Sequence, residues 1–590
     1  MKTLTNEVPC WWRPHGSLSS TTGPFSSSLA DALLDVGRRI VVVETGGELA
    51  LARGGVLFED AGPPRADSCA VRAVVPALCP WQLGDPGFLQ SHRLRYPYVA
   101  GAMANGISSV EMVCRMAEVG MLAFFGAAGL EPDRVEQAIE QISKTVGSRS
   151  FGSNLIHSPS EPGLEDRIVD LYLRHGVRRV CASAFLSLTP AIVRYRFNGI
   201  HRAPDGSVLT PNHVFAKLSR VELARRFFAP PPTDILALLV EQGSLTAEQA
   251  ELAAHLPVAQ DVTAEADSGG HTDNRSSFPL IPSVLAVRDE LQVRYGDTVQ
   301  LRVGAAGGIG TPSAAAAAFA MGVAYVMTGS VNQACVEAGT SPAVRQMLAQ
   351  AGQADVAMAP SADMFEMGVK VQVLKRATMF SVRARKLAEI YRAYESPEDL
   401  PPNERSLLER DYFRCSLEEE WAQTRAFFNR RDPRQLERAD RDPKHRLALL
   451  LRSYLGRASG WANDGDPGRR VDYQIWCGPA MGAFNEWVRG TFLENPDERR
   501  VVTVGLNLMM GAAVMTRVAS LRNQGIALPV NAWKYTPEPE SSIRERLALY
   551  AATREAAPSD ARTAASVFAF DTPPPRPVGA GIEQNRETLP

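Results

Sequence analysis

Between residues 97 and 330 the chain alternates short apolar runs with longer amphipathic stretches. The runs lack polar alternation, which is typical of strands buried on both faces of a parallel sheet. We predict strands at residues 98–103, 121–125, 150–156, 180–184, 213–217, 256–262, 299–303 and 325–328. Eight strand–helix repeats predict an α/β fold, a (β/α)8 TIM barrel. A doubly wound open sheet is the alternative, because periodicity does not show closure.

The regions on either side have different patterns. Residues 1–85 are punctuated by Gly and Pro around apolar runs at 40–44 and 71–75, which predicts a small β-rich N-terminal region. The barrel then spans 86–364, and residues 365–545 are expected to form a mainly helical cap or substrate domain. Its long amphipathic helices are predicted at 368–394 and 407–428. Residues 546–590 are rich in Pro and predict a flexible tail.

Composition narrows the classes of partner. The net charge of -2, from 63 basic and 65 acidic side chains, gives no support for a nucleic-acid or membrane partner. The eight cysteines form no CxxC pair, so we predict neither a metal site nor a disulfide framework, and we expect a cytoplasmic protein. The N-terminus lacks the apolar core of a signal peptide. The most apolar stretch, 501–519, is interrupted by polar residues and predicts a buried helix rather than a membrane span.

Candidate chemistry lies where the predicted strands end, because the carboxyl ends of barrel strands face the active site. Ala102 and Met103 close the first strand, where small residues let a flat ring approach the backbone. Asn154 ends the third strand with an amide that can bond a heterocycle edge or a ribityl chain. Lys217 ends the fifth strand and offers a positive charge. The sixth strand leads to Gly269-Gly270-His271.

The last two strands end in small residues that suit a phosphate. Gly307 and Gly308 follow the seventh strand, and Gly329 and Ser330 follow the eighth. Backbone amides and helix N-termini in these loops favour an anion. Each feature alone has a purely structural explanation. Agreement among six strand ends favours a site for a phosphorylated cofactor.

Several motifs resemble known families. The Met103 loop, residues 151–154, the Gly-Gly-His at His271 and the Gly307-Gly308 loop resemble the FMN-dependent nitronate monooxygenase superfamily. Longer motifs at 264–275, 327–333, 362–368 and 472–482 resemble, more narrowly, the PfaD family of trans-acting enoyl reductases. Members of that family serve polyunsaturated fatty acid synthases and polyketide synthases.

The resemblance implies an enzyme that uses NADPH and FMN to reduce the α,β-double bond of an enoyl thioester. The thioester would be held on an acyl carrier protein domain of the synthase, and a homodimer is left open. His271 would be the catalytic hydrogen-bond or proton donor. The implied cofactor contacts are Ala102, Met103, Asn154, Lys217, Gly269, Gly270, Gly307, Gly308, Gly329 and Ser330. The alternatives are a nitronate monooxygenase, which uses FMN and oxygen, and a flavin-free scaffold that docks onto a synthase.

Overall fold

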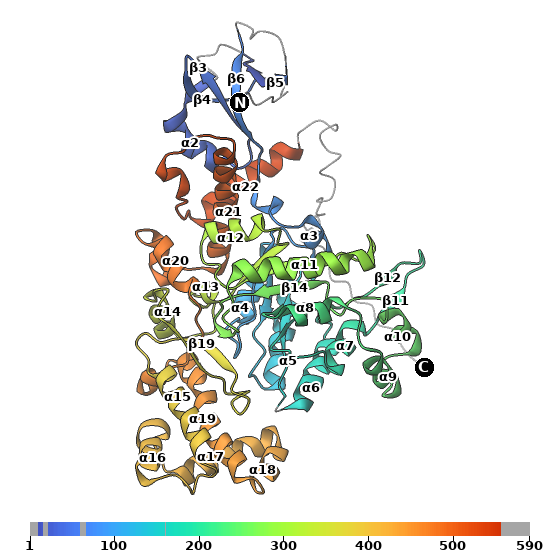
Figure 1. The fold of residues 1–590 in the computed structure, drawn as a ribbon, viewed down its shortest axis with the longest axis vertical. Coiled ribbons are helices and arrows are strands. Elements are labelled where there is room, and N and C mark those ends of the chain that lie inside the picture. The colour runs from blue at the N-terminus through green and yellow to red at the C-terminus, as the bar shows by residue number, and fades with distance from the viewer. Residues whose placement is uncertain (1–9, 16–21, 60–66, 160, 556–590) are drawn as a thin grey trace, which may run out of the picture. The chain divides into compact units, whose positions relative to one another are not determined.

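The computed structural model describes residues 10–15, 22–59, 67–159 and 161–555, and eight of its strands close into a parallel barrel (Figure 1). The strands follow the chain as β7 (Tyr98–Ala100), β8 (Leu122–Phe125), β9 (Gly152–Ile156), β10 (Arg179–Ser183), β13 (His213–Leu218), β14 (Asp261–Glu265), β16 (Arg302–Ala306) and β17 (Tyr325–Thr328). β17 pairs with β7, which closes the sheet. The predicted barrel is confirmed, and the open sheet is excluded.

Helices flank the barrel strands. They are α3 (Pro86–His92), α4 (Val110–Glu118), α5 (Pro132–Val146), α6 (Pro162–Arg174), α7 (Pro190–Phe197), α8 (Val221–Phe228), α11 (Ser277–Tyr295), α12 (Pro312–Ala320) and α13 (Ser330–Gln333). Inserted between them are a hairpin, β11 (His201–Arg202) with β12 (Val208–Leu209), and the helices α9 (Thr233–Glu241) and α10 (Ala247–Ala253).

The predicted positions of the sixth and seventh strands were wrong by several residues. β14 and β16 begin at Asp261 and Arg302, which are buried side chains joined by an ion pair at 2.7 Å. A strand that begins with a buried charge looks polar in the sequence unless its partner is known. The apolar residues before β14 pack outside the barrel sheet, where the Val258 amide bonds the Ala229 carbonyl just after α8.

The N-terminal region is β-rich, as predicted. Its sheet has the order β2 (Thr22–Pro24), β4 (Glu48–Ala52), β3 (Ile40–Thr45), β6 (Cys69–Val75), β1 (Cys10–Arg13) and β5 (Val56–Glu59), with α2 (Phe25–Leu34) beside it. The helix α21 (Val501–Asn523) adjoins this region, since buried Arg517 donates to the carbonyls of Leu33, Asp35 and Arg38 at 2.6–2.9 Å. By length and composition α21 could cross a membrane, but 94% of its most apolar window is buried within the protein.

The region after the barrel is mainly helical, as predicted. Its helices are α14 (Pro342–Ala349), α15 (Phe380–Ala393), α16 (Pro402–Leu407), a π-helical turn (Leu408–Phe413), α17 (Leu417–Arg431), α18 (Pro433–Ala439), α19 (Pro443–Asp464), α20 (Ala480–Val488) and α22 (Glu540–Glu555). Short 3-10 helices lie at Pro80–Gln82, Pro467–Asp472, Phe492–Glu494, Pro496–Glu498 and Val530–Trp533. The first ten residues of the segment predicted as a tail, 546–555, therefore belong to a helix, and 556–590 lie outside the described residues.

A small antiparallel sheet lies outside the barrel strands and was not predicted. It has the order β15 (Gly270–His271), β19 (Lys370–Leu374) and β18 (Val356–Pro360), and we call it the accessory sheet. The expected helix at 368–394 was wrong over its first residues, because Val371 and Val373 pair in β19. Branched side chains favour such paired strands. The accessory sheet joins the loop after β14 to the segment before the helical region.

Candidate active site

A pocket lies at the carboxyl ends of the barrel strands and gathers most of the predicted site residues. The predicted residues that line it are Ala102, Met103, Lys217, Gly269, Gly307, Gly308, Gly329 and Ser330. Asn154, Gly270 and His271 are not among the lining residues. The carboxyl-terminal ends of five strands, β7, β13, β14, β16 and β17, or the loops after them, thus meet at one site.

Two of the glycines leave open space in the pocket. A Cβ atom at Gly308 or at Gly329 would meet no protein atom within 4 Å. Gly307 and Gly308 have φ angles of 81° and 76°, a conformation that L side chains rarely adopt. At Gly307 a Cβ would lie 2.7 Å from the backbone of Ala266. Backbone atoms therefore form this wall, and only glycine keeps it accessible.

Asn154 and Lys217, two of the three polar residues predicted to contact a cofactor, are held by protein partners. The buried Asn154 amide donates to the Cys181 carbonyl at 3.0 Å and to the Ser183 hydroxyl at 3.1 Å. Lys217 lines the pocket but forms an ion pair with Glu265 of the next strand. Glu265 also accepts a hydrogen bond of 2.9 Å from Ser268. Glu265 was not predicted as a site residue, because the sixth strand was predicted to end at residue 262, whereas β14 ends at Glu265.

His271 is held by the accessory sheet beside the pocket. It pairs with Val371 of β19, and its Nε2 lies 3.1 Å from both Asp363 Oδ1 and Ser361 Oγ. The imidazole side chain is 29% exposed. Burial lowers the pKa of His271, but the charge and hydrogen bond of Asp363 outweigh burial and leave this pKa above its ordinary value. Burial opposes ionisation of Asp363 as well, yet His271 and Ser361 hold the pKa of this carboxyl well below its usual range.

A buried glutamine fixes the loop that carries His271. Gln372 of β19 is only 2% exposed, and its Nε2 donates to Asp267 Oδ1 at 2.6 Å and to the Ser268 carbonyl at 2.8 Å. Its Oε1 accepts from Asn274 at 3.2 Å. The loop is therefore bonded to β19 on both sides of His271. Nothing in the sequence around Gln372 singled it out.

The segment around Trp476 completes the pocket from far along the chain. Trp476, Gly478 and Ala480 line it, and the Gly478 amide donates to Ser330 Oγ at 3.0 Å. A Cβ at Gly269 would lie 2.8 Å from the Cys477 amide nitrogen. Cys477 itself is fully buried, and burial raises the pKa of its thiol to about 12. The segment therefore shapes the pocket through backbone and Trp476, whereas the thiol is inert packing.

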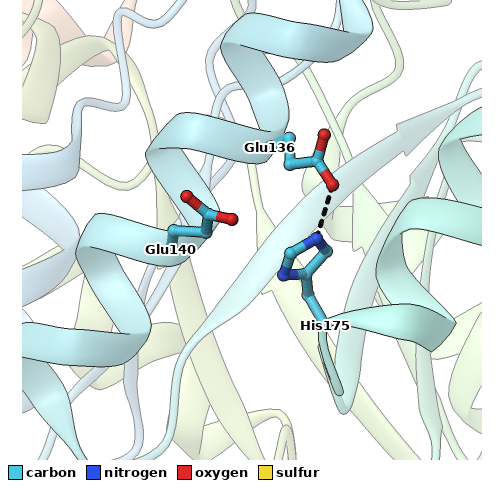
Figure 2. A group of neighbouring side chains, drawn as sticks. All are labelled: Glu136, Glu140 and His175. Atoms are coloured by element: carbon cyan, nitrogen blue, oxygen red, sulfur yellow. Dashed lines mark hydrogen bonds and ion pairs between the residues drawn. The ribbon is translucent and has the colours of Figure 1, made fainter.

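One group of side chains in the described part of the chain could hold a metal ion. Glu136 and Glu140 of α5 lie near His175, with their ligand atoms within 4.8 Å of one another (Figure 2). His175 Nε2 is 2.6 Å from Glu136, which also accepts from Arg174 at 3.1 Å. The guanidinium already balances the charge of this carboxylate. We therefore assign no metal to the group.

Comparison with known proteins shows the family to which the chain belongs. A crystal structure of the enoyl reductase domain of MlnA, from the macrolactin biosynthesis cluster of Bacillus amyloliquefaciens, matches with a TM-score of 0.71 and 40% identity. The match covers 75% of this chain and 99% of that domain. The chain belongs to this enoyl reductase family. The resemblance to PfaD-type enoyl reductases is thereby confirmed.

Two further relatives are longer than the segment that matches this chain. One polyunsaturated fatty acid synthase polypeptide of Thraustochytrium is 45% identical over 469 residues, which are 78% of this chain and 31% of that polypeptide. Polyketide biosynthesis protein PksE of Bacillus subtilis is 43% identical over 445 residues, 75% of this chain and 58% of that protein. The chain thus spans less than two thirds of these relatives. Residues 394–473 also match the inserted helical domain of [acyl-carrier-protein] S-malonyltransferase.

Proposed function

We propose that the chain reduces the α,β-double bond of an enoyl thioester, with FMN as cofactor and NADPH as hydride donor. The substrate would be carried by acyl carrier protein domains of a polyketide or polyunsaturated fatty acid synthase, on which the chain acts in trans. The observation that carries this proposal is the glycine-lined pocket at the barrel's carboxyl end with His271 beside it.

The pocket residues fit a flat cofactor with a terminal phosphate. Open space above Gly308 and Gly329 gives an anion access to backbone atoms, and Ser330 adds a hydroxyl. These residues and Gly307 would hold the phosphate. Ala102, Met103 and Gly269 would lie against the ring. When bound, FMN supplies hydride transfer between the nicotinamide and the enoyl β-carbon.

His271 would stabilise negative charge on the substrate and donate a proton. Negative charge develops on the thioester oxygen as the β-carbon gains a hydride, and the α-carbon then needs a proton. A protonated imidazole beside the pocket can supply a hydrogen bond and the proton. Asn154, whose amide donors are used inside the barrel, would orient β9 and β10 rather than contact the cofactor. Lys217 would act together with Glu265 as a neutral pair.

The test is reduction of a crotonyl group loaded on an acyl carrier protein. Purified protein is mixed with NADPH and this substrate, and NADPH loss and product mass are followed. A gain of two hydrogens on the acyl group that depends on NADPH supports the proposal. Cofactor reduction without acyl reduction, together with turnover of a nitroalkane and oxygen, would move the assignment to a nitronate monooxygenase. A colourless protein without activity would favour the scaffold.

A further inference from the structure

The contacts of His271 use one ring nitrogen and leave the other available. Nε2 approaches Asp363 Oδ1 and Ser361 Oγ, both at 3.1 Å, and Ser361 Oγ in turn donates to the same carboxylate oxygen. Among the residues that the structure describes, no group bonds Nδ1 of His271. The ring is therefore anchored at Nε2, and Nδ1 is not engaged by a described residue.

The accessory sheet holds this arrangement in register. His271 lies on β15 opposite Val371, whereas Ser361 and Asp363 lie just after β18. The Ser361 amide bonds the Val369 carbonyl at 2.9 Å, which closes the connection between β18 and β19. The carboxylate is thus fixed relative to the imidazole by backbone pairing. This carboxylate belongs to the motif at 362–368, to which the sequence alone assigned no chemical role.

We infer that Asp363 is the positioning residue for His271: it fixes which ring nitrogen faces the substrate and balances the charge of the protonated imidazole. This inference rests on the proposed enoyl reduction. It assigns a function to a carboxylate that does not line the pocket.

The proton then follows a defined path. Once the β-carbon has gained a hydride, the resulting thioester enolate would take a proton at its α-carbon. The Nδ1–H bond of His271 breaks and the α-carbon–H bond forms, so the ring becomes neutral. Its remaining proton stays on Nε2 and continues to be donated to Asp363. A proton from water restores the charged ring before the next turnover.

The charges around His271 decide the direction of the pH effect. Asp363 and Glu265 favour the protonated ring, whereas burial and Lys217 oppose it. The net effect raises the pKa of His271, so the acid form persists to a higher pH than that of an ordinary histidine. The rate should fall as pH rises through this raised pKa. Removing the Asp363 charge should move this basic limb to lower pH.

The experiment compares Asp363→Asn, Asp363→Glu and the wild-type protein across pH. We expect Asp363→Asn to lower kcat about 10- to 100-fold at pH 8 and to move the basic limb down by about one pH unit or more. Cofactor content and the rate of cofactor reduction by NADPH should stay unchanged. Asp363→Glu keeps the charge and should return the limb toward its wild-type position.

A matched control is the surface pair of His175 and Glu136, which has the same kind of contact (Figure 2). Glu136→Gln should leave the basic limb in place. NMR titration of labelled histidines, with His271 assigned by its loss in His271→Gln, measures the same group without turnover. In the wild-type protein its midpoint should lie above 6.5.

The outcomes distinguish failure of the proposed enoyl reduction from failure of the inference about Asp363. A wild-type protein that reduces no enoyl thioester overturns the proposed function, while the His271 midpoint still reports on Asp363. A midpoint at or below 6.5 for His271 in the wild-type protein overturns the inference, whether or not the Asp363 variants fold. An unmoved limb in folded Asp363→Asn also overturns it. A midpoint and a basic limb that are both lower in Asp363→Asn than in the wild-type protein support it.

Discussion

Gly308 is the residue at which cofactor binding can be tested most directly. Its φ of 76° and the open space around its Cβ position mean that any side chain would project into the pocket. We expect Gly308→Val to be purified without FMN and without activity, because the side chain occupies the proposed phosphate position. The absorbance of the purified protein near the flavin bands measures this.

Backbone strain needs a separate control, because valine at a positive φ costs about 1–2 kcal/mol wherever it occurs. Gly243 has a φ of 67°, is exposed and has no atom within 4 Å of its Cβ position. Gly243→Val should therefore carry similar strain and keep its flavin. Equal loss of flavin in both variants would mean that strain alone explains the effect.

Cys477 is the second residue with a clear chemical expectation. Its thiol is fully buried and has a pKa raised to about 12, so almost no thiolate exists near neutral pH. We expect iodoacetamide to leave Cys477 unmodified in the folded protein at pH 7.5 and to modify it after denaturation. Peptide mass spectrometry decides this. Rapid labelling of Cys477 in the folded state would show that the Trp476 segment opens.

At the residue scale, the sequence identified single site residues better than the contacts between residues. The glycines around 307 and 329 were found because their strand ends and turns are local features. Asp363 and Gln372 were not, because their meaning comes from contacts with a loop about a hundred residues earlier. Asn154 was expected at the cofactor, but its amide faces β10, a direction that residue spacing does not define.

At the scale of elements, the starts of β14 and β16 are joined by a buried ion pair. Asp261 accepts from two nitrogens of Arg302 at 2.7 and 3.1 Å and lies 2.9 Å from His92. Asp261→Asn would leave the Arg302 charge buried without its partner. We expect a loss of about 3–5 kcal/mol in the free energy of unfolding. Urea denaturation measures it.

Asp273 provides the comparison for Asp261. It forms an ion pair at 2.9 Å with Arg220, whose side chain is 46% exposed. Asp273→Asn should change stability by no more than about 1 kcal/mol, because solvent screens the pair. Equal losses of unfolding free energy in the two variants would show that burial does not decide how much each ion pair matters for stability.

Most barrel elements were predictable because uninterrupted apolar runs mark strands buried on both faces. The exceptions have physical reasons. β14 and β16 carry buried charges that look polar until their partners are known. The accessory sheet includes a strand of two residues, too short to have a periodicity. Its β19 comes shortly before α15 in the chain, and the amphipathic pattern at 368–394 does not separate the strand from the helix.

At the scale of the whole molecule, Arg517 links α21 to the N-terminal region. Its guanidinium donates to three carbonyls of residues 33–38 and is 1% exposed. In Arg517→Met these acceptors lose their donor, at a cost of about 1–3 kcal/mol for each carbonyl left buried and unpaired. We expect faster thermolysin cleavage between residues 22 and 85.

The exposed Arg522, on the same helix, is the matched substitution. Arg522→Met removes a positive charge without disturbing a buried acceptor and should leave the cleavage rate nearly unchanged. Cleavage is followed by mass spectrometry. If both variants are cut equally fast, the N-terminal region does not depend on Arg517.

The accessory sheet and the Trp476 segment set a minimum length for any shortened form of this protein that keeps the pocket. A cut at residue 364 would separate β18 from β19 and remove the strand that holds the His271 loop. A cut before residue 480 would remove part of the pocket wall. A fragment that carries only the barrel would therefore keep its strands but lose both the strand that holds the His271 loop and the Trp476 side of the pocket.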